Sequence, residues 1–179
     1  MNDNGKPMKV TDFRQDLLAA MDAENNPLVQ AAIRKWFPDC LAVHRAHKAN
    51  DCLGIDVWIE RPLARMTGVD LKIRSVDYGW KQSKPMDVAL EINYGGAPGW
   101  AMKSTATDTY LFVCTDTGRS AAFKADELRE ALEQNLGEWM GRYKTLTTRT
   151  ASYSGEPVAS QAICIPADVL KSACQSVRL

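Results

Sequence analysis

The sequence predicts one α/β domain with a mixed central sheet flanked by helices. Its length of 179 residues is close to that of one average domain, and 45% hydrophobic residues are enough for a buried core. Apolar residues recur at helical spacing near the beginning and toward the end of the chain. Between these segments, short alternating runs are separated by Gly, Pro and Asn, a pattern typical of strands joined by hairpins.

Four helices are predicted around this sheet. Apolar and acidic residues alternate at spacings of three to four over 11–23, which indicates an amphipathic helix. Asn26 and Pro27 provide an N-cap and a first-turn proline for a second helix, which ends before the next proline. A third helix is predicted over 126–136, and Pro166 opens a last one.

The strands are predicted mainly in the middle of the chain. Each is a short run of alternating or β-branched residues. These runs cover 40–45, 54–60, 68–75, 86–93, 109–115 and, as a shorter candidate, 119–123. The segment 143–156 is rich in Thr and Ser and is predicted to be irregular or an edge strand, and 161–165 is a last short strand.

Charge and hydropathy exclude several classes of protein. Lys plus Arg and Asp plus Glu both number 22, so the net charge is zero and any anion site has to be local. The longest stretches without a charge, 92–102 and 157–167, are much shorter than the roughly 18 residues that span a bilayer. The first residues lack the apolar core of a secretory signal, so we expect no membrane partner and a cytoplasmic location.

Residue parity places several charged side chains on one face of the predicted sheet. Successive side chains of a strand point to opposite faces, so Asp56 projects away from its aliphatic neighbours, and Asp70 and Lys72 project together. Glu91 lies on the polar side of the strand at 86–93. If these strands are neighbours with aligned faces, the four side chains converge, and three carboxylates beside one ammonium favour a bound cation.

Such a group suits a hard divalent cation. Mg²⁺ prefers oxygen ligands and is often held by one or two carboxylates together with substrate phosphates. A metal there can polarise a phosphodiester, and Lys72 can orient or help to deprotonate the attacking water. The plainer alternative is a structural salt bridge on a solvated face, because an acid two residues before a lysine is expected about once by chance in such a chain.

These residues resemble the bipartite signature of the PD-(D/E)XK nuclease superfamily, which includes restriction endonucleases and Holliday-junction resolvases. The resemblance consists of Gly54-Ile55-Asp56, thirteen further residues, and Asp70-Leu71-Lys72. The segments 87–92, 98–100 and 107–113 are similar to the strands that follow the signature in uncharacterised nuclease-like proteins of phages and plasmids. Ile55 stands in place of the proline that gives the signature its name.

The resemblance covers about 28–136. It implies a restriction-endonuclease-like fold over the single domain 1–179, with the N-terminal helix and the C-terminal Thr/Ser-rich segment as additions. It also implies a nuclease that uses Mg²⁺ or Mn²⁺, with Asp56 and Asp70 as metal ligands, Lys72 as the catalytic lysine and Glu91 as an optional ligand. Two alternatives are a catalytically inactive nucleic-acid or protein-binding module on the same scaffold and a small oligomeric structural protein.

Nucleic acid, with DNA favoured over RNA, is the expected partner, and a homodimer is compatible with the resemblance. Between residues 61 and 84, six basic residues stand against two acids in an otherwise neutral chain, and phosphates attract such a segment. An aromatic in the same segment can stack on an unpaired base or cap the edge of the core. The candidate nucleic-acid-binding residues are Arg61, Arg65, Arg74, Trp80, Lys81 and Lys84.

Overall fold

A computed structural model of the chain describes residues 25–51, 53–77, 79, 84–151 and 157–176. The helix predicted at 11–23 lies outside the described residues, as do Trp80 and Lys81. Within the described part, helices and strands alternate along the chain, so the predicted α/β class is confirmed.

A mixed five-stranded sheet forms one half of the fold. It follows the order β1-β2-β3-β6-β7, in which β3 and β6 are parallel and all other neighbours are antiparallel. The predicted mixed sheet is therefore present. Its strands are β1 (Ala42–Arg45), β2 (Val57–Arg61), β3 (Arg65–Arg74), β6 (Thr109–Cys114) and β7 (Ser120–Lys124).

The other half is an antiparallel four-stranded sheet in the order β5-β4-β9-β8. The strand at 86–93 does not lie beside the strand at 68–75, which was the condition for Glu91 to converge with Asp70, because β2 and β6 occupy the two edges of β3 and β4 pairs with β9 instead. The Thr/Ser-rich segment forms the edge strand β8 of this sheet. The strands are β4 (Asp87–Tyr94), β5 (Ala97–Pro98), β8 (Lys144–Ala151) and β9 (Pro157–Pro166).

The helices pack on the two sheets. Helix α2 begins as predicted, since Asn26 Oδ1 accepts a hydrogen bond of 2.9 Å from the backbone amide of Leu28. Helix α4 is longer than the predicted 126–136, because Trp139 is buried and extends its apolar face by another turn. In the described part of the chain, no helix has the length and apolar character needed to cross a membrane. The helical segments are α2 (Pro27–Trp36), α3 (Lys48–Asp51), η2 (Trp100–Met102), α4 (Ala125–Arg142) and α5 (Ala167–Ser176).

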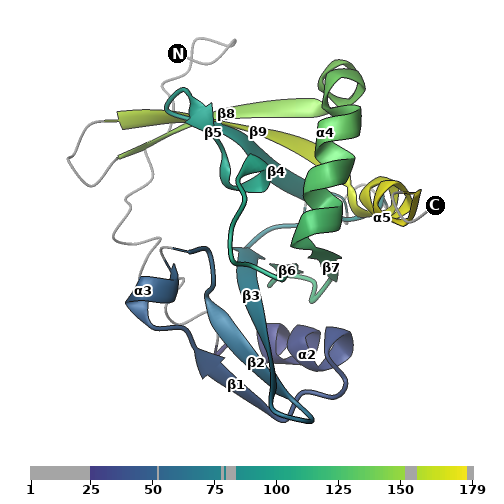
Figure 1. Cartoon of the computed structure of the whole chain (residues 1–179). Helices are drawn as coiled ribbons and strands as arrows, with labels where there is room; N and C mark the ends of the chain where they lie inside the picture. Colours follow the sequence, from purple (N-terminus) through teal and green to yellow (C-terminus); the bar gives the residue numbers. More distant parts are fainter. Residues whose placement is uncertain (1–24, 52, 78, 80–83, 152–156, 177–179) are drawn as a thin grey trace.

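The five-stranded sheet separates two hydrophobic clusters. One lies against α2 and includes Val57, Ile59 and Val69. The other includes Phe112 of β6 and residues of β4, β9, α4 and α5. Figure 1 shows α2 against the lower sheet and α4 and α5 beside the upper one. Because the aliphatic residues of β2 and β3 face α2, the polar residues between them in sequence emerge on the side of the second cluster, as parity predicts.

Candidate active site

Two carboxyl groups meet where β2 and β3 pair. Asp56 immediately precedes β2, and its backbone amide donates to the carbonyl of Val69 at 3.0 Å. Its carboxylate accepts a hydrogen bond of 2.6 Å from the amide of Leu71, which fixes the side chain against β3. Besides burial, Asp56 contributes to the raised pKa of Asp70, so the two carboxyl groups lie close enough to interact. The predicted convergence of these two acids therefore occurs.

Lys72 completes the group from the same strand as Asp70. Its Nζ lies 2.8 Å from Asp70 Oδ1, and the Asp70 side chain is only 8% exposed whereas that of Lys72 is 26% exposed. Burial raises the pKa of Asp70 to about 6, Lys72 opposes this rise, and the neighbouring Asp56 adds to it. One ammonium thus compensates the pair of carboxyl groups only in part.

Aromatic rings hold the ammonium in place. Lys72 Nζ lies 4.3 Å from the centroid of the Trp100 ring and 6.0 Å from that of Tyr110. Trp100 in turn packs on Tyr110 with ring centroids 5.0 Å apart. Cation–π attraction and the ion pair with Asp70 restrain the lysine from two sides, so its position is defined before any substrate arrives.

Trp100 reaches this position because Gly99 packs directly on β4. A Cβ atom on Gly99 would collide with the carbonyl oxygen of Glu91, beside the irregularity in β4 between Glu91 and Asn93. The sequence pattern did not identify Trp100 as part of this site. Tyr110 lies opposite Asp70 in the parallel β3–β6 pair, and parity would have placed it on this face had that pairing been known.

Glu91 does not join the other acids on a shared sheet. It belongs to β4 in the second sheet, and its Oε1 accepts a hydrogen bond of 3.4 Å from the backbone amide of Trp100. Among the residues that the structure describes, no group of three or more His, Cys, Asp or Glu side chains is arranged to hold a metal ion. The carboxylate pair of Asp56 and Asp70 is thus the remaining part of the predicted ligand set.

The predicted basic segment is divided between the two ends of β3. Arg65 begins the strand and Arg74 ends it, which puts them about 30 Å apart at the usual rise per residue. Arg74 donates to the backbone carbonyl of Asp87 at 3.4 Å. Lys84 is exposed, and its backbone carbonyl accepts a hydrogen bond of 3.1 Å from Arg119. Arg61 stays near Arg65. Those of the predicted basic residues that the structure describes therefore form no single continuous patch.

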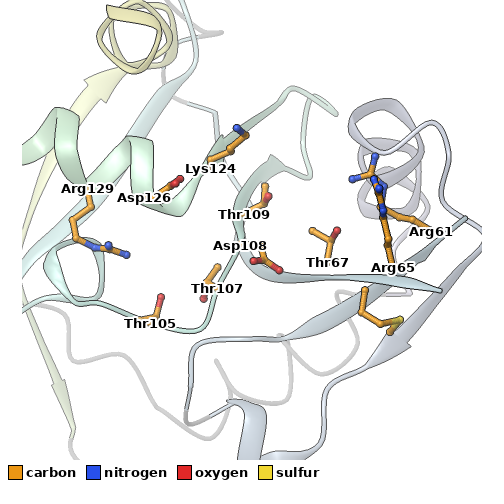
Figure 2. A pocket seen from close by; sticks show the side chains of 11 residues that line it. Arg61, Arg65, Thr67, Thr105, Thr107, Asp108, Thr109, Lys124, Asp126 and Arg129 are labelled. Atoms are coloured by element: carbon orange, nitrogen blue, oxygen red, sulfur yellow. The ribbon is translucent and has the colours of Figure 1, made fainter. Parts of the chain in front are cut away.

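A groove of about 620 Å³ opens at the Arg65 end of β3. Figure 2 shows Arg61 and Arg65 on one side of it and Lys124, Asp126 and Arg129 on the other. Sequence reasoning identified only the first two, because the opposite side is brought close by the parallel pairing of β3 and β6. Between the two sides lie four threonines and an aspartate, namely Thr67, Thr105, Thr107, Asp108 and Thr109.

Two residues of the groove contact neighbours of the carboxylate pair, although Asp56, Asp70 and Lys72 do not themselves line it. The hydroxyl of Thr107 donates to the carbonyl of Gly54, two residues before Asp56, and Thr105 Oγ1 lies 3.5 Å from the hydroxyl of Tyr110. No family model, curated protein or solved structure matches this chain, so its chemistry has to be inferred from these side chains themselves.

Proposed function

We propose that the protein is a metal-dependent nuclease that hydrolyses phosphodiester bonds, with DNA as the favoured substrate. The observation that carries this proposal is that the Asp56 carboxylate is held against β3 by the amide of Leu71 at 2.6 Å, between Asp70 and Lys72, whose Nζ lies 2.8 Å from Asp70. A pair of acids and a lysine in this arrangement is the combination that the resemblance to PD-(D/E)XK nucleases implies.

The two carboxylates suit Mg²⁺ or Mn²⁺ by the chemistry of their donors. When both are ionised, Asp56, Asp70 and Lys72 together carry one negative charge. Burial raises the pKa of Asp70, and the neighbouring charge of Asp56 adds to this rise. Two carboxylates are a common protein contribution to a Mg²⁺ site, where water and substrate phosphate supply the other ligands. Bound there, the ion would supply Lewis-acid stabilisation of the charge that develops on the phosphate.

Lys72 is the residue of this chain best placed to act on the attacking water. Its ammonium is partly exposed, so it can donate to a water molecule or a phosphate oxygen while its ion pair with Asp70 and the Trp100 ring hold it in place. The amide of Leu71 keeps Asp56 turned toward Asp70 at the same time. Because these contacts hold both side chains in place, Lys72 and Asp56 can orient the reactants without a rearrangement of the backbone.

The same observations support a restriction-endonuclease-like core as the finer description of the fold. The mixed sheet places the acid before β2 beside the Asp-Leu-Lys run of β3, which is the feature of the superfamily that the sequence resembles. Helix α2 covers the opposite face of this sheet and leaves the polar face to the site.

A binding module without catalysis is the second candidate. The specific observation in its favour is that Lys72 already neutralises Asp70, whose side chain is mostly covered. In that case the cluster is a structural ion pair, and the basic groove alone would contact nucleic acid.

Cleavage of plasmid and branched DNA in Mg²⁺ or Mn²⁺ separates the two candidates. We expect the wild-type protein to cleave, and Asp70→Asn and Lys72→Ala to lose the activity. Glu133→Gln and Lys171→Ala make the same kinds of charge change at exposed positions outside the site and should retain it. Equal cleavage by wild type and both site variants would indicate a contaminating nuclease, and metal binding without cleavage of any substrate would favour the binding module.

A further inference from the structure

The groove at the Arg65 end of β3 is lined mainly by charged side chains and threonines. Four of its side chains are cationic and two are acidic, so its lining carries an excess of two positive charges in a protein whose net charge is zero. Its neutral polar groups are threonine hydroxyls. Arginine, lysine and threonine are among the residues that contact phosphate oxygens in protein–nucleic-acid complexes.

Two of the cations retain charge that a phosphate can use. Arg129 Nε donates to the backbone carbonyl of Lys103 at 3.1 Å, and this neutral acceptor holds the side chain without cancelling its charge. Arg65 is exposed at the start of β3 on the opposite side of the groove. By contrast, Arg61 is engaged by Asp39 at 2.8 Å and Lys124 by Glu127 at 3.0 Å.

The two acids of the lining are directed to backbone amides. Asp108 Oδ2 accepts a hydrogen bond of 2.7 Å from the amide of Gly68, and Asp126 Oδ1 accepts one of 2.8 Å from the amide of Glu127. These bonds fix the turn into β6 and the first turn of α4. They orient both carboxylates toward the protein's own backbone, and the lining keeps its excess of two positive charges, which favours an anion between Arg65 and Arg129.

The size and position of the groove favour one strand over two. Its volume of about 620 Å³ is in the range of a pocket for a small ligand, which can hold a short piece of one strand but not the two strands of a duplex. The two sides bound a path that passes Thr105 and Thr107, and these residues contact Tyr110 and Gly54 next to the carboxylate pair.

We propose that this groove binds the sugar-phosphate backbone of unpaired nucleic acid and leads it to Asp56 and Asp70, with Arg65 and Arg129 contacting separate phosphates. This inference rests on the proposed nuclease function and names its substrate class as a single strand or the unpaired part of a branched molecule. The hydroxyls of Thr67 and Thr109, which also line the groove, donate to the phosphates between the two arginines.

The test measures binding without catalysis. Fluorescence anisotropy of a labelled oligothymidylate of about 12 nucleotides is followed in EDTA, with the full-length protein, between about 50 and 200 mM salt. We expect Arg65→Gln and Arg129→Gln each to weaken binding about 5-fold and to reduce the salt dependence by about 0.7 in log Kd per log salt, the value for one phosphate contact on a single strand. Arg142→Gln, at the exposed far end of the same helix, is the matched control and should bind like wild type.

The inference is overturned if both groove variants bind like wild type, if Arg142→Gln loses as much binding as they do, or if a duplex of the same length competes equally well. A thymidine monophosphate that competes as well as the oligomer would also overturn it, since it would show an isolated phosphate site. Cleavage assays distinguish this inference from the proposed function. If binding depends on the groove but the wild-type protein does not cleave with metal, only the nuclease proposal is refuted. If Asp70→Asn loses cleavage but the groove variants cleave like wild type, only the groove proposal is refuted.

Discussion

Replacing Asp70 with asparagine should stabilise the protein at neutral and alkaline pH even though it removes a proposed catalytic group. The pKa of Asp70 in the folded protein, about 6, lies about 2 above its ordinary value of 3.8 because the carboxyl is buried beside Asp56. Each pKa unit corresponds to 1.36 kcal/mol, so the ionised Asp70 costs the folded state about 3 kcal/mol above pH 7. Asparagine imitates the neutral acid and avoids this cost.

The pH dependence gives the prediction its sign. Well below pH 3.8 Asp70 is neutral in both the folded and the unfolded chain, so the variant and the wild type have similar stability. As the pH rises from there toward about 6, Asp70 ionises in the unfolded chain while it stays largely protonated in the folded protein, and the wild type loses stability. The advantage of Asp70→Asn should therefore grow from near zero at about pH 3 to about 3 kcal/mol at about pH 8.

Urea denaturation at a series of pH values, in EDTA, measures this difference. Asp39→Asn is the control, and it should lower the stability instead of raising it. A hydrogen bond from Arg61 lowers the pKa of Asp39, so the ionised form of Asp39 favours the folded state. A variant Asp70→Asn that is no more stable than wild type at about pH 8, or whose advantage is the same at about pH 3, would refute the reasoning about this buried pair.

Three further predictions concern other parts of the fold. Leu63 and Ala64, in the turn between β2 and β3, have φ angles of 65° and 56°. Ala64→Gly should raise the free energy of unfolding by about 1 kcal/mol, and a lower melting temperature would contradict this. Arg119 lies 3.2 Å from Asp77, whose side chain is 1% exposed. Arg119→Met should cost about 3 kcal/mol in urea denaturation because it takes this partner from a buried carboxylate, and a loss of less than about 0.5 kcal/mol would be inconsistent with that. Gly99→Ala should shift the urea midpoint downward and reduce cleavage, because the added Cβ collides with the backbone of β4 and displaces Trp100; an unchanged midpoint would show that the contact is not tight.

Parity predicted the orientation of the site well. Val69 and the aliphatic residues on either side of Lys72 pack in the hydrophobic cluster against α2. A strand that buries these residues on one face has to present Asp70 and Lys72 on its other face. The same rule identified Asp56, because the chain enters β2 in register with β3. When one face of a strand is strongly apolar, the alternation of residues is therefore enough to predict which side chains share its polar face.

The partner of each strand could not be predicted in the same way. Alternation in β4 fits either sheet, and its choice of β9 depends on a strand some 70 residues later in the sequence. For that reason Glu91 was expected beside Asp70 and is found in the second sheet. The groove is a further consequence of long-range pairing, since Arg65 and Arg129 are brought to its two sides only by the parallel contact of β3 and β6.

Anomalous diffraction from a crystal soaked in Mn²⁺ tests most directly whether the carboxylate pair is a metal site. We predict a peak bound by oxygen atoms of both Asp56 and Asp70, with Lys72 nearby, and its loss in Asp70→Asn. A saturating Mn²⁺ soak that yields no peak at these two residues, with their side chains still in contact, would contradict a metal-dependent nuclease at this site.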